Sequence, residues 1–291
     1  MSFEIISSSE GKEETQRNAL LIKIMIKLSV IIPSYHDPSL NKTVEDILKH
    51  SGLEKDELEI ICILDGYWTV PVADPRVRVL HLGGNRGMRE AINAGVAIAN
   101  GEYLMRTDEH CSFANGFANE IIKNMEDNWI VTPTRYELDI IRWKRMDNPP
   151  VNFTKLSIQR VSEEVQKFTA VPWKERDEKM KDVMIAETEG MQGSCWFMKK
   201  SWWEKVIVEL DTETYGSLIQ DSTEMIFKTW KAGGKMMLNK NTWHAHRHRK
   251  FGRTHNNGSK ENPANCDYGY TQAIKIWGDF YKNVIIPKRE I

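Results

Sequence analysis

The sequence predicts an α/β protein with a mostly parallel β-sheet and helices packed on its faces. Three observations indicate this class. Apolar, strand-like runs at residues 27–33, 58–64 and 102–107 alternate with segments of helical spacing, which favours right-handed parallel crossovers. One helical segment, 86–99, is rich in small residues, which suits close packing on a sheet. The 291 residues are also enough for a large core in one or two domains.

The first half of the chain shows the clearest alternation. Pro33 ends the first apolar run, and Asp65 with Gly66 ends the second. Apolar spacing through Val44 and Ile47 predicts a helix between them. We therefore expect strands at 27–33, 58–64, 76–80, 102–107 and 129–132, and helices at 40–50, 86–99 and 113–127.

The segment 133–190 interrupts this pattern because it is rich in charge and contains Pro149 and Pro150. A long irregular insertion in a compact enzyme is often a binding or gating element, and a solvated excursion with one or two surface helices fits equally well. Regular structure then returns. We expect strands at 194–198 and 235–238, helices at 201–210, 221–231 and 268–281, and a mobile polar loop at 247–265.

The composition excludes several classes of protein. Lys and Arg total 40 against 41 Asp and Glu, a formal charge of −1, which argues against a dedicated nucleic-acid binder. The four cysteines lack CxxC spacing, so we expect buried thiols rather than a disulfide framework. The apolar run 19–28 is interrupted by two lysines and is too short to span a bilayer. We therefore expect a cytoplasmic protein without a membrane anchor.

A candidate metal site follows the strand expected at 102–107. Asp108 and His110 supply one carboxylate and one imidazole at the edge of the sheet where open α/β folds bind ligands. Such mixed ligation suits Mn²⁺ better than Mg²⁺ or Ca²⁺. A third ligand must come from elsewhere, and we choose His244 in the cluster 244–249. That cluster could instead be a basic surface patch or an anion site without metal.

Other polar residues fit the binding of a nucleotide diphosphate. Asp65 could accept the N3–H of uracil, although an Asp-Gly pair also forms turns readily. Three arginines could pair with phosphates through guanidinium forks, or be solvated: Arg86, Arg89 and Arg247. Asp221 and Glu224 share a helix face and could contact a sugar or an acceptor hydroxyl. They could instead be acidic residues that only stabilise a helix N-terminus.

Ordered motifs in this chain resemble those of known glycosyltransferases. KLSVIIPSYHD (27–37), ILDG (63–66) and the stretch 84–110 resemble the nucleotide half of family 2-type GT-A glycosyltransferases. TDEHC (107–111) is similar to the Asp-X-His-Cys signature of polypeptide N-acetylgalactosaminyltransferases. Further segments resemble the acceptor side of that family: EGMQGSCWFMKKSWWEKV (189–206), QDSTEMIFKTWKAGGKM (220–236), NTWHAHRHRK (241–250), which is similar to its VGHVFRK segment, and IKIWGDFYKN (274–283).

The resemblance implies a GT-A fold and a domain plan. We expect a single catalytic domain at 27–283, with an N-terminal tail at 1–26 and a C-terminal tail at 284–291. Within that domain, 27–132 would form the nucleotide-binding half, 133–190 the insertion and 191–283 the acceptor half. The loop 247–265 would close over the nucleotide.

The resemblance also assigns roles to particular residues. The nucleotide contacts implied are Ser34, His36, Asp65, Arg86 (one residue from Asn85 in the alternative alignment) and Arg247. The implied metal ligands are Asp108, His110 and His244, and the active-site acids are Asp221 and Glu224. The family's Trp-Gly-Gly is replaced by residues 218–220, Leu-Ile-Gln, and its Glu-Asn pair by Asp221-Ser222, so contacts to the sugar or the acceptor can differ.

The expected activity is transfer of a hexose or N-acetylhexosamine from a UDP-sugar to a hydroxyl, with Mn²⁺ or another divalent cation. The expected partners are the UDP-sugar and a hydroxyl acceptor, a protein or peptide Ser or Thr, and the expected outcome is retention of configuration. One alternative is an inverting family 2-type transferase that builds a polysaccharide or glycolipid with Asp221 as base. Another is a sugar-nucleotide-binding protein without catalysis.

Overall fold

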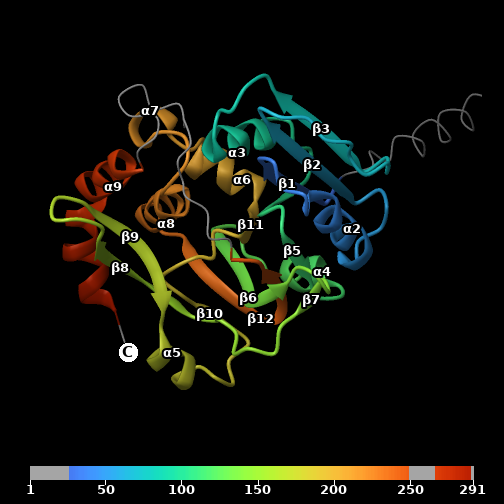
Figure 1. Cartoon of the computed structure of the whole chain (residues 1–291). Helices are drawn as coiled ribbons and strands as arrows, with labels where there is room; N and C mark the ends of the chain where they lie inside the picture. The colour runs from blue at the N-terminus through green and yellow to red at the C-terminus, as the bar shows by residue number, and fades with distance from the viewer. Residues whose placement is uncertain (1–25, 249–265, 290–291) are drawn as a thin grey trace, which may run out of the picture.

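The computed structural model describes residues 26–248 and 266–289 (Figure 1). Residues 1–25 of the expected N-terminal tail and residues 249–265 of the expected loop lie outside the described residues. Within the described ranges, no helix is both long enough and apolar enough to span a bilayer.

The structure confirms the α/β class, with a central sheet of ten strands flanked by helices. Eight strands follow the spatial order β10-β12-β6-β11-β4-β1-β2-β3, while β5 pairs with β12 and β7 with β6. Their bounds are β1 (Leu28–Ser34), β2 (Leu58–Asp65), β3 (Val77–Leu82), β4 (Tyr103–Thr107), β5 (Cys111–Phe113), β6 (Trp129–Asp139), β7 (Lys144–Arg145), β10 (Ile185–Glu187), β11 (Cys195–Lys199) and β12 (Lys235–His246).

Most strands of the main path run in one direction. β3, β2, β1 and β4 pair in parallel, and β6 pairs in parallel with β12. β11 is antiparallel to both β4 and β6 and therefore joins the two parallel groups without changing their common direction. β10 pairs antiparallel with β12 at one edge. The carboxyl ends of β1, β2, β4, β6 and β12 consequently face the same edge of the sheet.

Side chains of alternate strand residues build a core on each face of the sheet, as the strand period requires. On β1, Ile31 packs in the core that contains α3 and α8, whereas Val30 and Ile32 pack in the core that contains α2 and α4. The helices are α2 (Leu40–His50), α3 (Met88–Ala97), α4 (Phe117–Ile122), α5 (Lys174–Lys179), α6 (Lys200–Trp202), α7 (Thr212–Tyr215), α8 (Asp221–Lys231) and α9 (Asp267–Phe280). A π-helical turn, η1 (Trp203–Ile207), follows α6.

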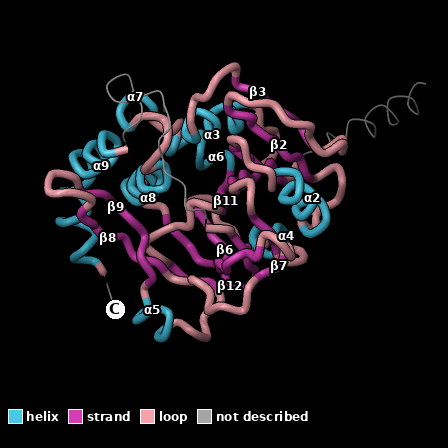
Figure 2. The backbone as a smooth tube through the Cα atoms, viewed as in Figure 1, coloured by secondary structure: helices cyan, strands magenta, loops and turns pink. Residues whose placement is uncertain are grey.

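The segment 133–190 contains more strand than its charge suggested. β6 runs on to Asp139, and β8 (Thr154–Arg160) with β9 (Gln166–Pro172) forms a separate antiparallel hairpin. The tube in Figure 2 shows this hairpin beside α9, and Phe168 of β9 lies 5.0 Å, ring to ring, from Phe227 of α8. The segment 133–190 therefore packs against α8 and α9 through this hairpin.

The last described residues are packed rather than extended. Beyond α9 the chain continues through a π-helical turn, η2 (Tyr281–Ile285), and a 3₁₀ turn, η3 (Ile286–Lys288). The guanidinium of Arg289 then lies 2.6 Å from the carboxylate of Glu189. Residues 284–289, which were expected as a tail, are thus held through Arg289 to the segment that precedes β11.

Gly87 shapes the turn that leads into α3. Its φ is +89°, which favours glycine, and a Cβ at this position would lie 2.6 Å from the carbonyl oxygen of Ser217. A Cβ at the neighbouring Gly83 would have no atom within 4 Å, and the backbone there imposes no such constraint. The turn therefore requires glycine at one position and tolerates a side chain at the other.

We predict that Gly87→Ala lowers the free energy of unfolding by about 1–3 kcal/mol, because both the backbone conformation and the contact with Ser217 oppose a side chain. Gly83→Ala is the matched control and should stay within about 0.5 kcal/mol of wild type. Urea denaturation of the three proteins measures the difference. Equal midpoints for both variants would show that the turn relaxes at no cost.

Candidate active site

The carboxyl ends of the parallel strands gather most of the candidate residues at one edge of the sheet. β1 ends at Ser34, β2 at Asp65 and β4 at Thr107. A cavity of about 710 Å³ lies at this edge, where open α/β sheets bind ligands. Its lining comes from these strand ends, the turn after β4, the hairpin β8–β9, the start of α8 and the end of β12.

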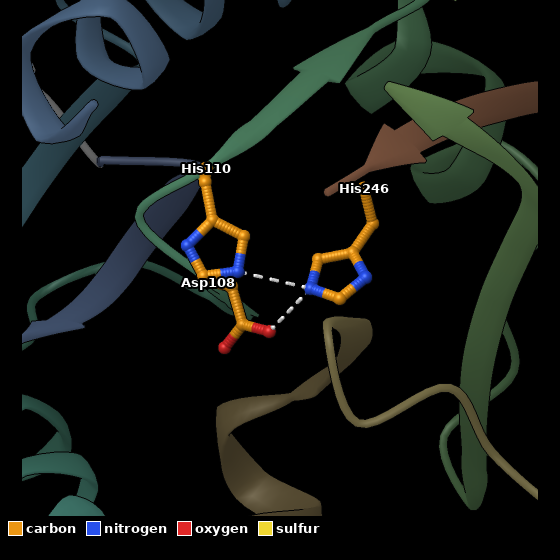
Figure 3. Close-up of side chains that lie close together, drawn as sticks. All are labelled: Asp108, His110 and His246. Atoms are coloured by element: carbon orange, nitrogen blue, oxygen red, sulfur yellow. Dashed lines mark hydrogen bonds and ion pairs between the residues drawn. The ribbon is translucent and has the colours of Figure 1, made fainter. Parts of the chain in front are cut away.

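Three side chains converge at this cavity (Figure 3). Asp108 and His110 lie in the turn between β4 and β5, and His246 ends β12. The Nε2 atoms of the two imidazoles lie 3.1 Å apart, and Asp108 Oδ2 lies 3.1 Å from His246 Nε2. One ligand atom from each residue lies within 4.8 Å of the other two. This arrangement can hold a divalent cation that accepts mixed carboxylate and imidazole ligation.

The structure places His246, and not the expected His244, in this group. β5 pairs with β12 so that His246 lies opposite Cys111, whereas His244 lies opposite Phe113. Two residues advance a strand by about 6.6 Å, which moves His244 away from His110. His244 is fully buried, and its Nε2 lies 3.0 Å from Ser194 Oγ. The candidate third ligand is therefore His246.

Asp37 sets the orientation of the His110 ring. Its buried Oδ2 lies 2.8 Å from His110 Nδ1, and its Oδ1 accepts a hydrogen bond of 2.7 Å from the backbone NH of Ser39. A carboxylate on one ring nitrogen selects the tautomer in which the other nitrogen carries a lone pair. His110 Nε2, which faces His246, is the nitrogen thus prepared to ligate a cation.

Arg106 performs a related function for Asp108. Its guanidinium lies 2.6 Å from Asp108 Oδ1 and leaves Oδ2 toward the imidazoles. Burial alone would raise the pKa of Asp108, but Arg106 and His246 outweigh burial and hold that pKa well below its usual range. Burial also lowers the pKa of His246, against the opposing effect of Asp108. An ionised carboxylate and a neutral imidazole are the protonation states that bind metals.

Asp65 organises the turn before α3. Its carboxylate accepts hydrogen bonds from the backbone NH groups of Arg86 and Gly87 and from Asn85 Nδ2 (3.1 Å). Burial raises the pKa of Asp65, and those two backbone hydrogen bonds counteract part of the effect. A carboxylate offers about four acceptor positions, so three partners leave capacity for a ligand at the cavity that Asp65 lines.

Ser34 and His36 lie at the end of β1 and line the same cavity. The Ser34 hydroxyl hydrogen-bonds to the hydroxyl of Tyr67, and the His36 ring lies 4.6 Å from the Tyr67 ring. His36 has a φ of +56°, a conformation uncommon outside glycine. This turn therefore presents an aromatic surface with a polar rim next to Asp65.

The two expected phosphate-binding arginines are placed differently. Arg86 is exposed, and its backbone NH rather than its side chain contacts Asp65. The backbone NH of Arg247 donates to the carbonyl of His110 (3.2 Å). Neither residue is among the described residues that line the cavity, whereas the residue after Arg247, His248, is.

Asp221 and Glu224 lie one turn apart on α8, but their side chains have different surroundings. Asp221 lines the cavity, and its Oδ2 is buried without a hydrogen-bond partner among the described residues. Glu224 is 1% exposed, pairs with the buried Arg89 and lies 2.7 Å from Lys228. Arg89, considered above for phosphates, is therefore used in a buried ion pair between α3 and α8. Of the two acids, Asp221 is the one that faces the cavity.

Asp37, Arg106 and His246 lie at the site although the sequence patterns above do not select them. A charged residue inside the apolar run 102–107 is one signal for Arg106, because an isolated buried charge is costly unless it has a partner. Asp37 follows closely after the strand end at Ser34. His246 stands two residues from His244 and so shares its strand face.

Comparison with known proteins identifies the family. Residues 29–207 match the family model "Glycosyl transferase family 2", which covers more than half of the chain. The chain belongs to glycosyl transferase family 2. It is therefore a glycosyltransferase. A search of curated proteins found no match.

Two solved structures confirm that this glycosyltransferase has the GT-A fold. One is the crystal structure of GalNAc-T7 with UDP, GalNAc and Mn²⁺, with a TM-score of 0.68 and 16% identity over 89% of this chain and 50% of that one. The other is the mannosyltransferase PcManGT from Pyrobaculum calidifontis in complex with GDP-Man and Mn²⁺, with a TM-score of 0.53 and 14% identity over 78% of this chain and 58% of that one. The matches thus span between half and three-fifths of these longer chains.

We predict that Glu224→Gln lowers the free energy of unfolding by about 3–5 kcal/mol, because it leaves Arg89 buried without its full counter-charge. The double variant Arg89→Met/Glu224→Leu should recover part of this loss. Glu120→Gln, which breaks the exposed pair with Lys123, is the control and should cost about 1 kcal/mol or less. Denaturant unfolding measures all three. A Glu224→Gln protein of wild-type stability would contradict the structural role of this residue.

Proposed function

We propose that this glycosyltransferase depends on a divalent cation and transfers a hexose or N-acetylhexosamine from a UDP-sugar to an acceptor hydroxyl. The observation that carries the proposal is the convergence of Asp108, His110 and His246 at the cavity on the carboxyl edge of the GT-A sheet. The two similar structures hold Mn²⁺ together with a nucleotide or a nucleotide sugar, which supports Mn²⁺ or another divalent cation here.

In this proposal the donor set fits the cation on three grounds. The ligand atoms comprise one carboxylate oxygen and two imidazole nitrogens within 4.8 Å of one another. Asp37 fixes the ligating nitrogen of His110, and Arg106 keeps Asp108 ionised. The chemistry that a bound divalent cation supplies is neutralisation of a diphosphate leaving group.

The residues around Asp65 would bind the nucleotide. Asp65 retains acceptor capacity for the N3–H of uracil, and Ser34 and His36 line the adjacent cavity wall. We keep Arg86 and Arg247 as candidate phosphate contacts, which requires their side chains to turn toward the cavity when the nucleotide binds. The main chain of Arg247 already lies against His110.

The acceptor is proposed to be a Ser or Thr hydroxyl of a protein, and the transfer to proceed with retention of configuration. Asp221 would orient the sugar and the acceptor hydroxyl from the N-terminus of α8. With retention, a phosphate oxygen of the leaving group can take the acceptor proton on the same face of the sugar. No side chain other than Asp221 is then needed beside that hydroxyl.

A second candidate is an inverting transferase that makes a polysaccharide or glycolipid. The buried Oδ2 of Asp221, without a partner among the described residues, favours it, because a general base must have an oxygen available for the proton of the acceptor. The anomeric configuration of the product, read by NMR, separates the two candidates. An inverted linkage would replace the first candidate with the second.

We predict that His246→Ala abolishes measurable Mn²⁺ binding, because one of three converging ligand atoms is lost. His244→Ala should keep Mn²⁺ binding within about threefold of wild type, although it loses stability through the contact with Ser194. Isothermal titration of Mn²⁺ into both folded variants measures the difference. Loss of binding in His244→Ala alone would restore His244 as the third ligand.

We predict that UDP release from at least one UDP-hexose or UDP-N-acetylhexosamine requires Mn²⁺ and stops on chelation. Asp108→Asn should lower turnover by a factor of about 100 or more, since a ligand and its charge are both lost. Circular dichroism checks that the variant remains folded. Wild-type release in the presence of a chelator would contradict metal dependence, and no release from any donor would contradict the proposed activity.

A further inference from the structure

Arg106 occupies an unusual position for a cation. It lies within the buried strand β4 and is 2% exposed, yet it lines the cavity next to Asp108. Its guanidinium pairs with Asp108 Oδ1 at 2.6 Å, donates to the carbonyl of Gly193, and has Met88 Sδ at 2.9 Å. A buried cation of this kind is costly unless its hydrogen-bonding groups are satisfied.

Arg106 and Asp221 each retain one unsatisfied buried polar atom. Arg106 Nε and Asp221 Oδ2 have no hydrogen-bond partner within the described part of the chain. The two residues come from β4 and from the first turn of α8, and both line the same cavity. Gly193 connects the two residues: its carbonyl accepts from the Arg106 guanidinium, and a Cβ built on it would lie 2.9 Å from the hydroxyl oxygen of Ser222, the residue that follows Asp221.

An unpaired donor and an unpaired acceptor, on two residues that line one cavity, complement a group that both accepts and donates. A hydroxyl does both with a single oxygen atom. A carboxylate would be repelled by Asp221 and Asp108, and an apolar group would leave Arg106 and Asp221 unsatisfied at a cost of about 1–3 kcal/mol for each buried group.

We propose that Arg106 and Asp221 form a subsite for one hydroxyl of the transferred sugar, to which Arg106 donates and from which Asp221 accepts. The inference rests on the proposed function and adds a donor-selecting residue to it. The sugar is favoured over the acceptor as the source of that hydroxyl, because Arg106 forms an ion pair with Asp108. Asp108 is the residue proposed to hold the cation beside the diphosphate.

The test compares the affinity for UDP with the affinity for the UDP-hexose or UDP-N-acetylhexosamine from which wild type releases UDP fastest. Both affinities are measured by isothermal titration with Mn²⁺ and without acceptor. The variants are Asp221→Asn, Arg106→Lys and the double variant. In each single variant the UDP-sugar should bind roughly 10- to 100-fold more weakly relative to UDP, as expected for hydrogen bonds to charged groups. The double variant should lose little more than either single one, because the two residues bind one group.

Monodeoxy analogues of the same UDP-sugar identify the hydroxyl. For wild type, one analogue should bind more weakly than the full UDP-sugar by the same factor of roughly 10 to 100. For Asp221→Asn, that analogue and the full UDP-sugar should bind equally well. Arg89→Gln is the matched control for removing a buried arginine, since Arg89 lies outside the cavity lining, and it should leave the ratio of the two affinities unchanged.

Three results would overturn the subsite. If UDP and the UDP-sugar weaken equally in Arg106→Lys while Asp221→Asn binds both as wild type does, Arg106 serves Asp108 alone. If both affinities stay at their wild-type values and a separate turnover assay of the variants shows only a raised KM for the acceptor, the hydroxyl belongs to the acceptor. If wild type binds UDP with Mn²⁺ but gains no affinity from any sugar, the sugar makes no contact there. Failure of wild type to bind any nucleotide would instead contradict the proposed function.

Discussion

The antiparallel pairing of β5 with the end of β12 is the interaction on which the site depends. β4 and β12 are separated in the sheet by β11 and β6, so their ends alone would not bring Asp108 and His246 together. The turn after β4 crosses this gap, because β5 places Cys111 opposite His246 and the carbonyl of His110 accepts from Arg247. Two segments more than 130 residues apart thereby share one potential cation site.

Local sequence pattern is sufficient for the strands that carry the site but not for their long-range register. The apolar runs before Asp65 and Asp108 predict β2 and β4 and the edge at which they end. The pattern predicts β12 only to residue 238, because the later residues of this strand are polar. In the structure the strand continues, and its register against β6 shifts between Asn239 and Trp243. His244 and His246 share a strand face, so the strand period does not distinguish them, whereas the pairing with β5 does. The spacing in the VGHVFRK-like segment holds a clue, since counting back from Arg249-Lys250 gives His246.

Asp221 and Glu224 illustrate the same limit on a helix. Residues three apart on a helix are neighbours, so the sequence favours a shared role. In the structure α8 is rotated so that Asp221 meets the cavity while Glu224 meets Arg89 of α3. The choice depends on where a buried arginine from another helix finds its counter-charge, which no local pattern contains. Arg106 is a second buried arginine, and its charge within an apolar strand is visible in the sequence even though its partners are not.

The charge of the cavity ties the proposed cation to the proposed donor. Among its described lining residues, Asp65, Asp108, Glu109 and Asp221 outnumber the cations Arg106 and Lys167. Arg106 is already engaged by Asp108, and a diphosphate entering this cavity would meet a surplus of carboxylates. A divalent cation held by Asp108 and the two imidazoles would reverse the local sign where the diphosphate must lie. Under the proposed function, cation binding and nucleotide binding therefore strengthen each other, and by linkage each does so by the same factor.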